Sequence, residues 1–203
     1  CLAANGIKAY VFESLRPTPE LSYAVRKLHT IAGINITASH NPPEYNGYKV
    51  YWEDGAQITP PHDSGIMNEV KAISDYAVCK KMDKDAAIAA GLYQTIGADI
   101  DDPYIEELKK LVVHQDAIDA VGSQIKVVYT PLHGTGNIPV RRVLKELGFT
   151  NVYVVPEQEL PDGDFPTVSY PNPEAKEAFT LGLALAKKVD ADQSESSQRW
   201  EMG

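Results

Sequence analysis

A strand-like run, Gly33-Ile34-Asn35-Ile36-Thr37, ends in the loop sequence Ala38-Ser39-His40-Asn41-Pro42-Pro43. Apolar and polar residues alternate in the first part, as they do in a half-buried β-strand. The second part combines a hydroxyl, an imidazole and an amide with two loop-forming prolines. In open α/β sheets, ligands bind at the carboxyl ends of the strands. Ser39 is therefore expected at a sheet edge where a ligand can reach it.

Regular elements are predicted on both sides of this loop in the first half of the chain. Residues 7–12 resemble a strand, and apolar residues then recur at helical spacing over residues 21–28. With the strand at 33–37, this gives the strand, helix, strand order of a right-handed parallel crossover. A further strand is expected over residues 48–52, after the turn signal Asn46-Gly47, and a helix near residues 66–73.

The periodicity weakens between residues 75 and 102, where only a short helix at 86–90 is predicted. We interpret this segment as a linker. A second domain is expected to begin near Pro103 with an amphipathic helix. It then continues with a strand at 125–129, the loop 130–137, a helix at 140–147, a strand at 151–155 and a final helix at 174–188.

These patterns predict an α/β protein with two consecutive three-layer α/β domains whose sheets are mixed but mainly parallel. The expected boundaries are 1–97 for the first domain and 98–192 for the second, with an irregular or non-native tail at 193–203. The chain begins with Cys1 rather than Met and almost at a strand, so we expect a fragment whose first domain is truncated at its N-terminus.

Composition narrows the class of protein. The formal charge of the 203 residues is −9, without a basic stripe, which argues against a nucleic-acid partner. There is no run of about 18 apolar residues, so we expect a soluble protein without a membrane span. Cys1 and Cys79 fit neither a disulfide framework nor a metal-ligand spacing, which indicates a reducing compartment and a cytoplasmic location.

Ser39 and His40 allow more than one interpretation. A Ser-His pair in a loop is usually solvated. A hydrolase is disfavoured because adjacent side chains in an extended loop point apart, and because the G-x-S-x-G elbow is missing. A serine flanked by His40, Asn41 and, beyond a turn, Lys49 suits a phosphoryl carrier better, since a cation and loop donors can share the phosphate charge.

Several motifs carry a resemblance to a known family. Thr37-Ala38-Ser39-His40-Asn41-Pro42 with Tyr45-Asn46-Gly47-Tyr48-Lys49 resembles the active-site serine loop of the α-D-phosphohexomutases, the phosphoglucomutases and phosphomannomutases. Tyr129-Thr130-Pro131-Leu132-His133-Gly134-Thr135-Gly136 resembles the loop that opens their second domain. Pro161-Asp162-Gly163-Asp164-Phe165-Pro166 and Pro171-Asn172-Pro173-Glu174 resemble later stretches of that domain. The motifs follow one another in the family's order.

The resemblance implies a function for the intact protein. Ser39 would be the phosphoserine that interconverts hexose 1-phosphate and hexose 6-phosphate through a bisphosphate intermediate, with glucose 1,6-bisphosphate as intermediate and activator. His40 and Lys49 match positions that transfer protons and stabilise charge near the serine. Mg²⁺ would bind through a phosphoserine oxygen of Ser39 and neutralise developing charge. The sugar and the oligomeric state stay open.

The chain also departs from the family pattern. The family's magnesium loop, Asp-x-Asp-x-Asp-Arg, is expected soon after the final helix, but Gln193-Ser194-Glu195-Ser196 follows Asp192. Asp190 and Asp192 match family positions before that loop, so we do not assign them as ligands. We therefore expect this chain alone to be nearly inactive. The alternative is a non-catalytic phosphosugar-binding or interaction module that lacks the metal loop.

Two further groups of residues call for a structural interpretation as well as a functional one. His133 and Gly134 lie in a glycine-bearing loop that could cradle phosphate, but a structural turn that supports the site is favoured, because glycine mainly supplies backbone freedom. Asp99, Asp101 and Asp102 are expected to cap a helix or to be solvated rather than to bind a metal.

Overall fold

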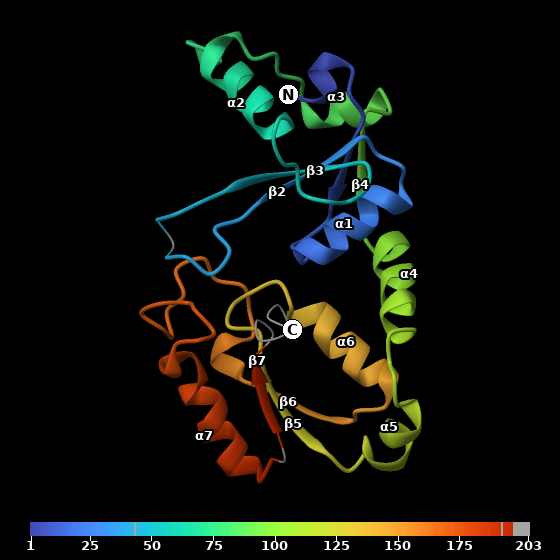
Figure 1. Ribbon diagram of the computed structural model, residues 1–203, viewed down its shortest axis with the longest axis vertical. Helices are drawn as coiled ribbons and strands as arrows, with labels where there is room; N and C mark the ends of the chain where they lie inside the picture. The colour runs from blue at the N-terminus through green and yellow to red at the C-terminus, as the bar shows by residue number, and fades with distance from the viewer. Residues whose placement is uncertain (43, 192, 197–203) are drawn as a thin grey trace. The chain divides into compact units, whose positions relative to one another are not determined.

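The computed structural model describes residues 1–42, 44–191 and 193–196 (Figure 1). The chain divides into two compact units. Unit 1 comprises Cys1–Ile34 and Val50–Ile100, and unit 2 comprises Asn35–Lys49 and Asp101–Gly203. The segment that carries Ser39 thus groups with unit 2, although it lies between two stretches of unit 1 in the sequence.

Unit 1 is built on a parallel pair of strands. β1 (Ala9–Phe12) pairs with β4 (Tyr93–Ile96) in the register Ala9↔Tyr93 to Phe12↔Ile96. Helix α1 (Thr18–Lys27) contributes Ala24 to a core that also contains Ile96 and Ile100. α1 starts at two prolines, Pro17 and Pro19, which suit the first helical turn because its N–H groups have no partner within the helix. The remaining elements of unit 1 are η1 (Ala3–Asn5), α2 (His62–Ala72), η2 (Tyr76–Val78) and α3 (Lys84–Ala89).

The predicted linker and the predicted start of the helix near Pro103 were wrong in part. Residues 93–96 form β4 within the expected linker. The segment has only four residues, but the backbone of β1 supplies hydrogen-bond partners for it. Helix α4 runs from Ala98 to Lys109, so Pro103 lies inside it and does not begin it. A proline there removes only one backbone hydrogen bond, the one to the carbonyl of Asp99.

Unit 2 contains a parallel sheet with strand order β6-β5-β7. The central strand β5 (Lys126–Thr130) is buried from Val127 to Thr130, as expected for a strand covered on both faces. It pairs with β6 (Asn151–Val154) and β7 (Gln193–Ser196). Helix α7 (Thr180–Val189) packs against β5, and α6 (Asn137–Leu147) packs against β6 (Figure 1). The predicted α/β class with mainly parallel sheets is confirmed.

Three other details of unit 2 differ from the prediction. Gln193–Ser196 is not irregular but forms β7, because the open edge of β5 supplies hydrogen-bond partners whatever the side chains are. Helix α5 (Gln115–Val121) was not predicted. The final helix starts at Thr180 rather than near Glu174 and is preceded by the short helix η4 (Lys176–Phe179). The other short helix of this unit is η3 (Pro156–Gln158).

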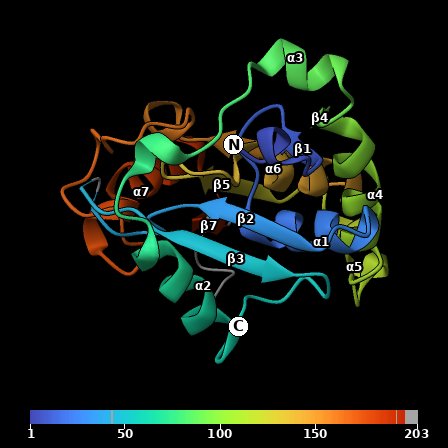
Figure 2. The same ribbon diagram turned by 90° about the horizontal axis from the view of Figure 1, so that it is seen from above.

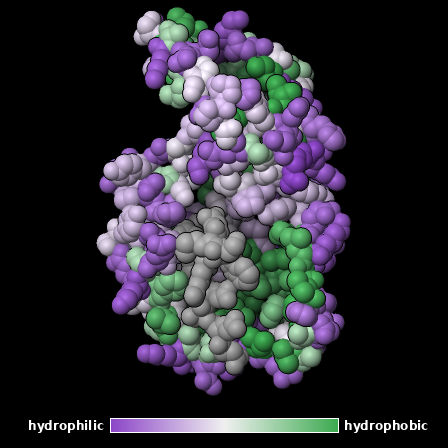
Figure 3. Space-filling view, in the orientation of Figure 1, coloured by the Kyte–Doolittle hydropathy of each residue, from purple (hydrophilic) through white to green (hydrophobic). Residues whose placement is uncertain are grey.

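The face of the molecule drawn in Figure 3 is mostly polar but has apolar areas. Figure 3 shows hydrophobic side chains exposed on the part of the chain that carries α4 to α6, where Leu111 and Val113 are among the most exposed. None of the described helices is long and apolar enough to cross a membrane.

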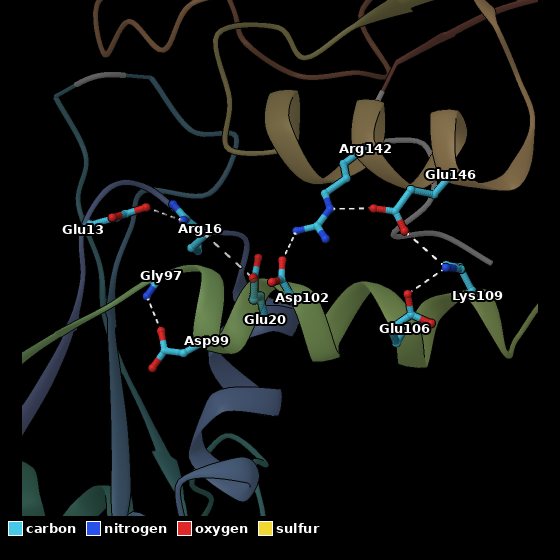
Figure 4. Close-up of polar contacts among 10 residues, drawn as sticks. All are labelled: Glu13, Arg16, Glu20, Gly97, Asp99, Asp102, Glu106, Lys109, Arg142 and Glu146. Carbon is cyan, nitrogen blue, oxygen red and sulfur yellow. Dashed lines mark hydrogen bonds and ion pairs between the residues drawn. The ribbon is translucent and has the colours of Figure 1, made fainter.

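Ionic contacts join α4 to α6 within unit 2 (Figure 4). The Arg142 guanidinium lies 2.7 Å from Asp102 and donates to Glu146 at 2.8 Å. Lys109 bridges Glu146 at 3.3 Å and Glu106 at 2.7 Å. Asp102, expected to be capping or solvated, therefore takes part in an ion pair between helices. The nearby Asp99 does act at the helix start, where its carboxylate accepts from the Gly97 N–H at 2.8 Å.

The network predicts a pH-dependent contribution to stability. Hydrogen bonds, chiefly from Arg142 and then from Lys109, lower the pKa of Glu146 from its ordinary value of 4.5. Because the pKa is lower in the folded than in the unfolded state, ionised Glu146 stabilises the folded protein above pH 4.5. This stabilisation is lost as the pH falls through the pKa of the folded state. We expect Glu146→Gln to lower the free energy of unfolding by about 0.5–1 kcal/mol at pH 7, since the pairs are partly exposed.

Urea unfolding at pH 7 and at pH 3 measures this effect. The difference in the free energy of unfolding between wild type and Glu146→Gln should shrink towards zero at pH 3. Glu107→Gln is the matched control, because Glu107 pairs with Lys110, just beyond the end of α4, and both side chains are more than half exposed. A difference for Glu146→Gln that stays constant over this pH range would contradict the assigned role.

Candidate functional site

The segment that carries Ser39 connects β2 (Ala32–Ile36) to β3 (Tyr48–Trp52), which lie side by side as a two-stranded sheet (Figure 2). The Thr37 N–H donates to the Gly47 carbonyl at 2.9 Å and so extends the hairpin beyond the strands. A Cβ atom on residue 47 would lie 2.7 Å from the Thr37 carbonyl oxygen, so only glycine allows this close approach. Thr37 and Gly47 thus hold the base of the serine loop.

Ser39 has a left-handed backbone conformation with φ of +56°. Its N–H donates to Thr37 Oγ1 at 2.9 Å, which anchors the turn. Its Oγ lies 3.2 Å from Nδ1 of His40. The prediction that the Ser39 and His40 side chains point apart was therefore wrong. It assumed an extended backbone, whereas the left-handed residue turns the chain so that neighbouring side chains meet.

The other predicted residues of this loop lie close by in the sequence. His40 and Asn41 are exposed, and the Asn41 N–H donates to the Ala38 carbonyl at 3.1 Å, which closes a tight turn. Lys49 is half-buried on β3. Within the described ranges its ammonium group makes no ion pair, and no contact brings it to Ser39. The structure thus brings Ser39 and His40 together, and the role of Lys49 stays a prediction.

His133 and Gly134 follow β5 at the carboxyl edge of the sheet in unit 2. His133 is only 6% exposed, and its two ring nitrogens face the Leu160 carbonyl and the Thr167 hydroxyl. The Gly134 N–H donates to the Pro131 carbonyl at 2.8 Å. These contacts favour the interpretation of a structural turn over a phosphate cradle. Sequence reasoning missed Thr167, because it lies 34 residues from His133 and no spacing pattern joins the two.

Nowhere in residues 1–42, 44–191 and 193–196 do three or more His, Cys, Asp or Glu side chains gather so that they could hold a metal. Asp190 ends α7 in a left-handed conformation with φ of +52°, and Asp192 lies outside the described residues. A phosphate on Ser39 would offer oxygen ligands, but the described part of the chain does not complete a magnesium site.

Comparisons with known proteins agree with the fold and with the motifs. The family model described as phosphoglucomutase/phosphomannomutase, alpha/beta/alpha domain I matches residues 1–77, and the model of domain II matches residues 102–194. A phosphoglucomutase of Staphylococcus saprophyticus is 43% identical over 190 residues, which cover 94% of this chain and 34% of that protein. A phosphopentomutase of Homo sapiens is 40% identical over 189 residues, covering 93% and 30%.

A solved structure from Thermus thermophilus, described as that of a phosphomannomutase, superposes with a TM-score of 0.73 at 26% identity. The match covers 96% of this chain and 40% of that one. The chain thus spans about a third of the length of the curated relatives that it matches. The models match both halves of the chain in the order that the motifs predicted, and the fold agrees. The chain belongs to the phosphoglucomutase/phosphomannomutase family.

Proposed function

We propose that this chain carries the phosphorylated serine of an enzyme that moves a phosphoryl group between two hydroxyls of a hexose phosphate. The observation that carries the proposal is the 3.2 Å contact between Ser39 Oγ and His40 Nδ1 on a loop anchored by Thr37 and Gly47. Relatives named as a phosphoglucomutase and a phosphopentomutase support a sugar phosphate as substrate. The reaction would be an intramolecular phosphoryl transfer of phosphoglucomutase type.

The proposed transfer exchanges one O–P bond for another. A sugar hydroxyl attacks the phosphorus of phosphorylated Ser39, so that a new sugar O–P bond forms while the Ser39 Oγ–P bond breaks. The sugar hydroxyl loses one proton and Ser39 Oγ gains one. The contact with Nδ1 of His40 suits the delivery of that proton and, in the return step, its removal. Lys49 is proposed to offset the charge of the phosphate.

Mg²⁺, when bound to a phosphate oxygen of Ser39, would supply charge neutralisation during the transfer. The described residues form no cluster of three or more metal-ligating side chains, so no step is assigned to the ion. Complete turnover is proposed for a protein as long as the relatives. For this chain the proposed activity is phosphoryl uptake on Ser39.

Two other functions are each favoured by one observation. A non-catalytic phosphosugar-binding module is favoured by the lack of a metal-binding cluster among the described residues. A serine hydrolase is favoured by the contact between Ser39 and His40, but nucleophilic catalysis of that type also needs a group that orients the histidine. No carboxylate of the described residues contacts the His40 ring.

Incubation with glucose 1,6-bisphosphate, with and without Mg²⁺, followed by intact-mass measurement tests the proposal. We expect the mass to rise by one phosphoryl group, and peptide mapping should locate that group on Ser39. No uptake under either condition would favour the binding module. Release of product from an activated ester, combined with no phosphoryl uptake, would favour the hydrolase.

A further inference from the structure

His133 lies at the carboxyl end of β5, where two successive residues have left-handed backbones. Leu132 has φ of +48° and is fully buried, and His133 has φ of +61° and is 6% exposed. Non-glycine residues rarely adopt this conformation, and such strain persists only where the surroundings hold it in place. The His133 N–H donates to the Gln158 carbonyl at 2.9 Å, which fixes the backbone at this point.

Four residues of the loop Leu160–Thr167 contact His133. Nδ1 lies 3.1 Å from the Leu160 carbonyl oxygen, and Nε2 lies 2.9 Å from the Thr167 hydroxyl. The Asp162 N–H approaches the His133 carbonyl at 3.4 Å. The Phe165 ring meets the imidazole edge to face, with centroids 6.3 Å apart. The loop is therefore held around one buried imidazole at both of its ends and along its length.

The partners determine which ring nitrogen carries the proton. A carbonyl oxygen only accepts, so His133 Nδ1 must donate to Leu160. Nε2 is then free to accept from the Thr167 hydroxyl, while Gln158 Nε2 donates to that hydroxyl at 3.1 Å. The Thr130 hydroxyl donates to Gln158 Oε1 at 2.6 Å. In this chain each group donates to the next, and the network fits the tautomer with its proton on Nδ1.

This arrangement leaves neither ring nitrogen of His133 for a ligand. We propose that His133 is a positioning residue: it holds the loop Leu160–Thr167 as a wall of the sugar-phosphate site and does not contact the phosphate. The placement of this loop at a sugar-phosphate site rests on the proposed function. The loop lies at the carboxyl edge of β5, where ligands of parallel sheets bind, in the unit that also contains residues 35–49.

The tautomer is tested on the unaltered chain by NMR correlation of the imidazole nitrogens with their protons. We expect the proton on Nδ1 of His133. A proton on Nε2 would overturn the inference. Titration with inorganic phosphate should leave the His133 ring resonances unchanged, and a shift that saturates with phosphate would show direct contact and overturn it as well.

Hydrogen exchange of the peptide that spans residues 160–168 tests the effect on the loop. In His133→Ala we expect exchange there to rise about tenfold or more, because two side-chain hydrogen bonds and the ring contact with Phe165 are lost together. His133→Asn should show a smaller rise, since asparagine tolerates a left-handed backbone and its amide can still donate to Leu160. His114→Ala is the matched control, because the His114 side chain is 77% exposed.

The strand β5 serves as an internal reference in the same experiment. Its amides should keep their exchange rates in His133→Asn. If exchange rises as much in β5 as in the loop, His133 supports the whole unit and the positioning role is overturned. The NMR and exchange measurements need no phosphoryl donor. If the unaltered chain takes up no phosphate while these results hold, the proposed function fails and the assignment of His133 to the loop stands.

Discussion

Ser39→Ala is expected to take up no phosphoryl group from glucose 1,6-bisphosphate, while the unaltered chain takes up one. Alanine lacks the Oγ that would form the bond to phosphorus, and among the described residues no other hydroxyl of this loop lies at hydrogen-bond distance from a histidine ring. The effect is a loss of the reaction itself rather than a reduction in its rate. Intact-mass measurement after a fixed incubation gives the result directly.

Ser64→Ala is the control for this experiment. Ser64 is an exposed serine on α2 in unit 1, where its hydroxyl contacts the neighbouring Asp63. This variant should take up one phosphoryl group at the rate of the unaltered chain. Uptake by Ser39→Ala would show that the phosphoryl group goes to another residue and would remove the basis of the proposed function.

Ile100→Ala is expected to cause a large loss in the free energy of unfolding. Ile100 is 1% exposed and packs with Ile96 and Ala24 in the core of unit 1. Replacement of a buried isoleucine by alanine costs about 2–5 kcal/mol through the lost transfer free energy and the cavity left behind. Because whole domains are stable by only about 5–15 kcal/mol, this change should leave unit 1 close to unfolding.

Urea unfolding followed by the fluorescence of Trp52, which belongs to unit 1, measures this loss. Ile88→Ala on α3 makes the same chemical change at a residue that is 47% exposed, and it should cost far less. Equal losses for the two variants would mean that Ile100 does not occupy the core as described.

The elements with a strong local pattern could be predicted from the sequence. β2, β3 and β5 were predicted because they combine β-branched or aromatic residues with clear turn signals at their ends. β4 and β7 were missed because each has only four residues, some of them polar in β4 and all of them polar in β7. Their strand conformation depends on a partner far along the chain, and pairing of this kind leaves no local signal.

The candidate site could also be predicted only in part. The residue types of the serine loop predicted a reactive hydroxyl at a strand end, and the family resemblance was confirmed. The contact between Ser39 and His40 was not foreseen, since it depends on one backbone angle that the sequence does not specify. The buried contacts of His133 join residues 25 to 34 positions apart, among them Gln158 and Thr167, and these follow only from the folded chain.

The left-handed backbone of Ser39 also limits which amino acids evolution or an engineer could place there. Threonine carries a hydroxyl, but its branched Cβ is poorly tolerated at a φ of +56°. Aspartate accepts this conformation and carries a permanent negative charge. The position therefore disfavours threonine as an alternative hydroxyl nucleophile, yet it accepts an acidic side chain that would keep the loop shape and carry a negative charge where the phosphorylated serine carries one.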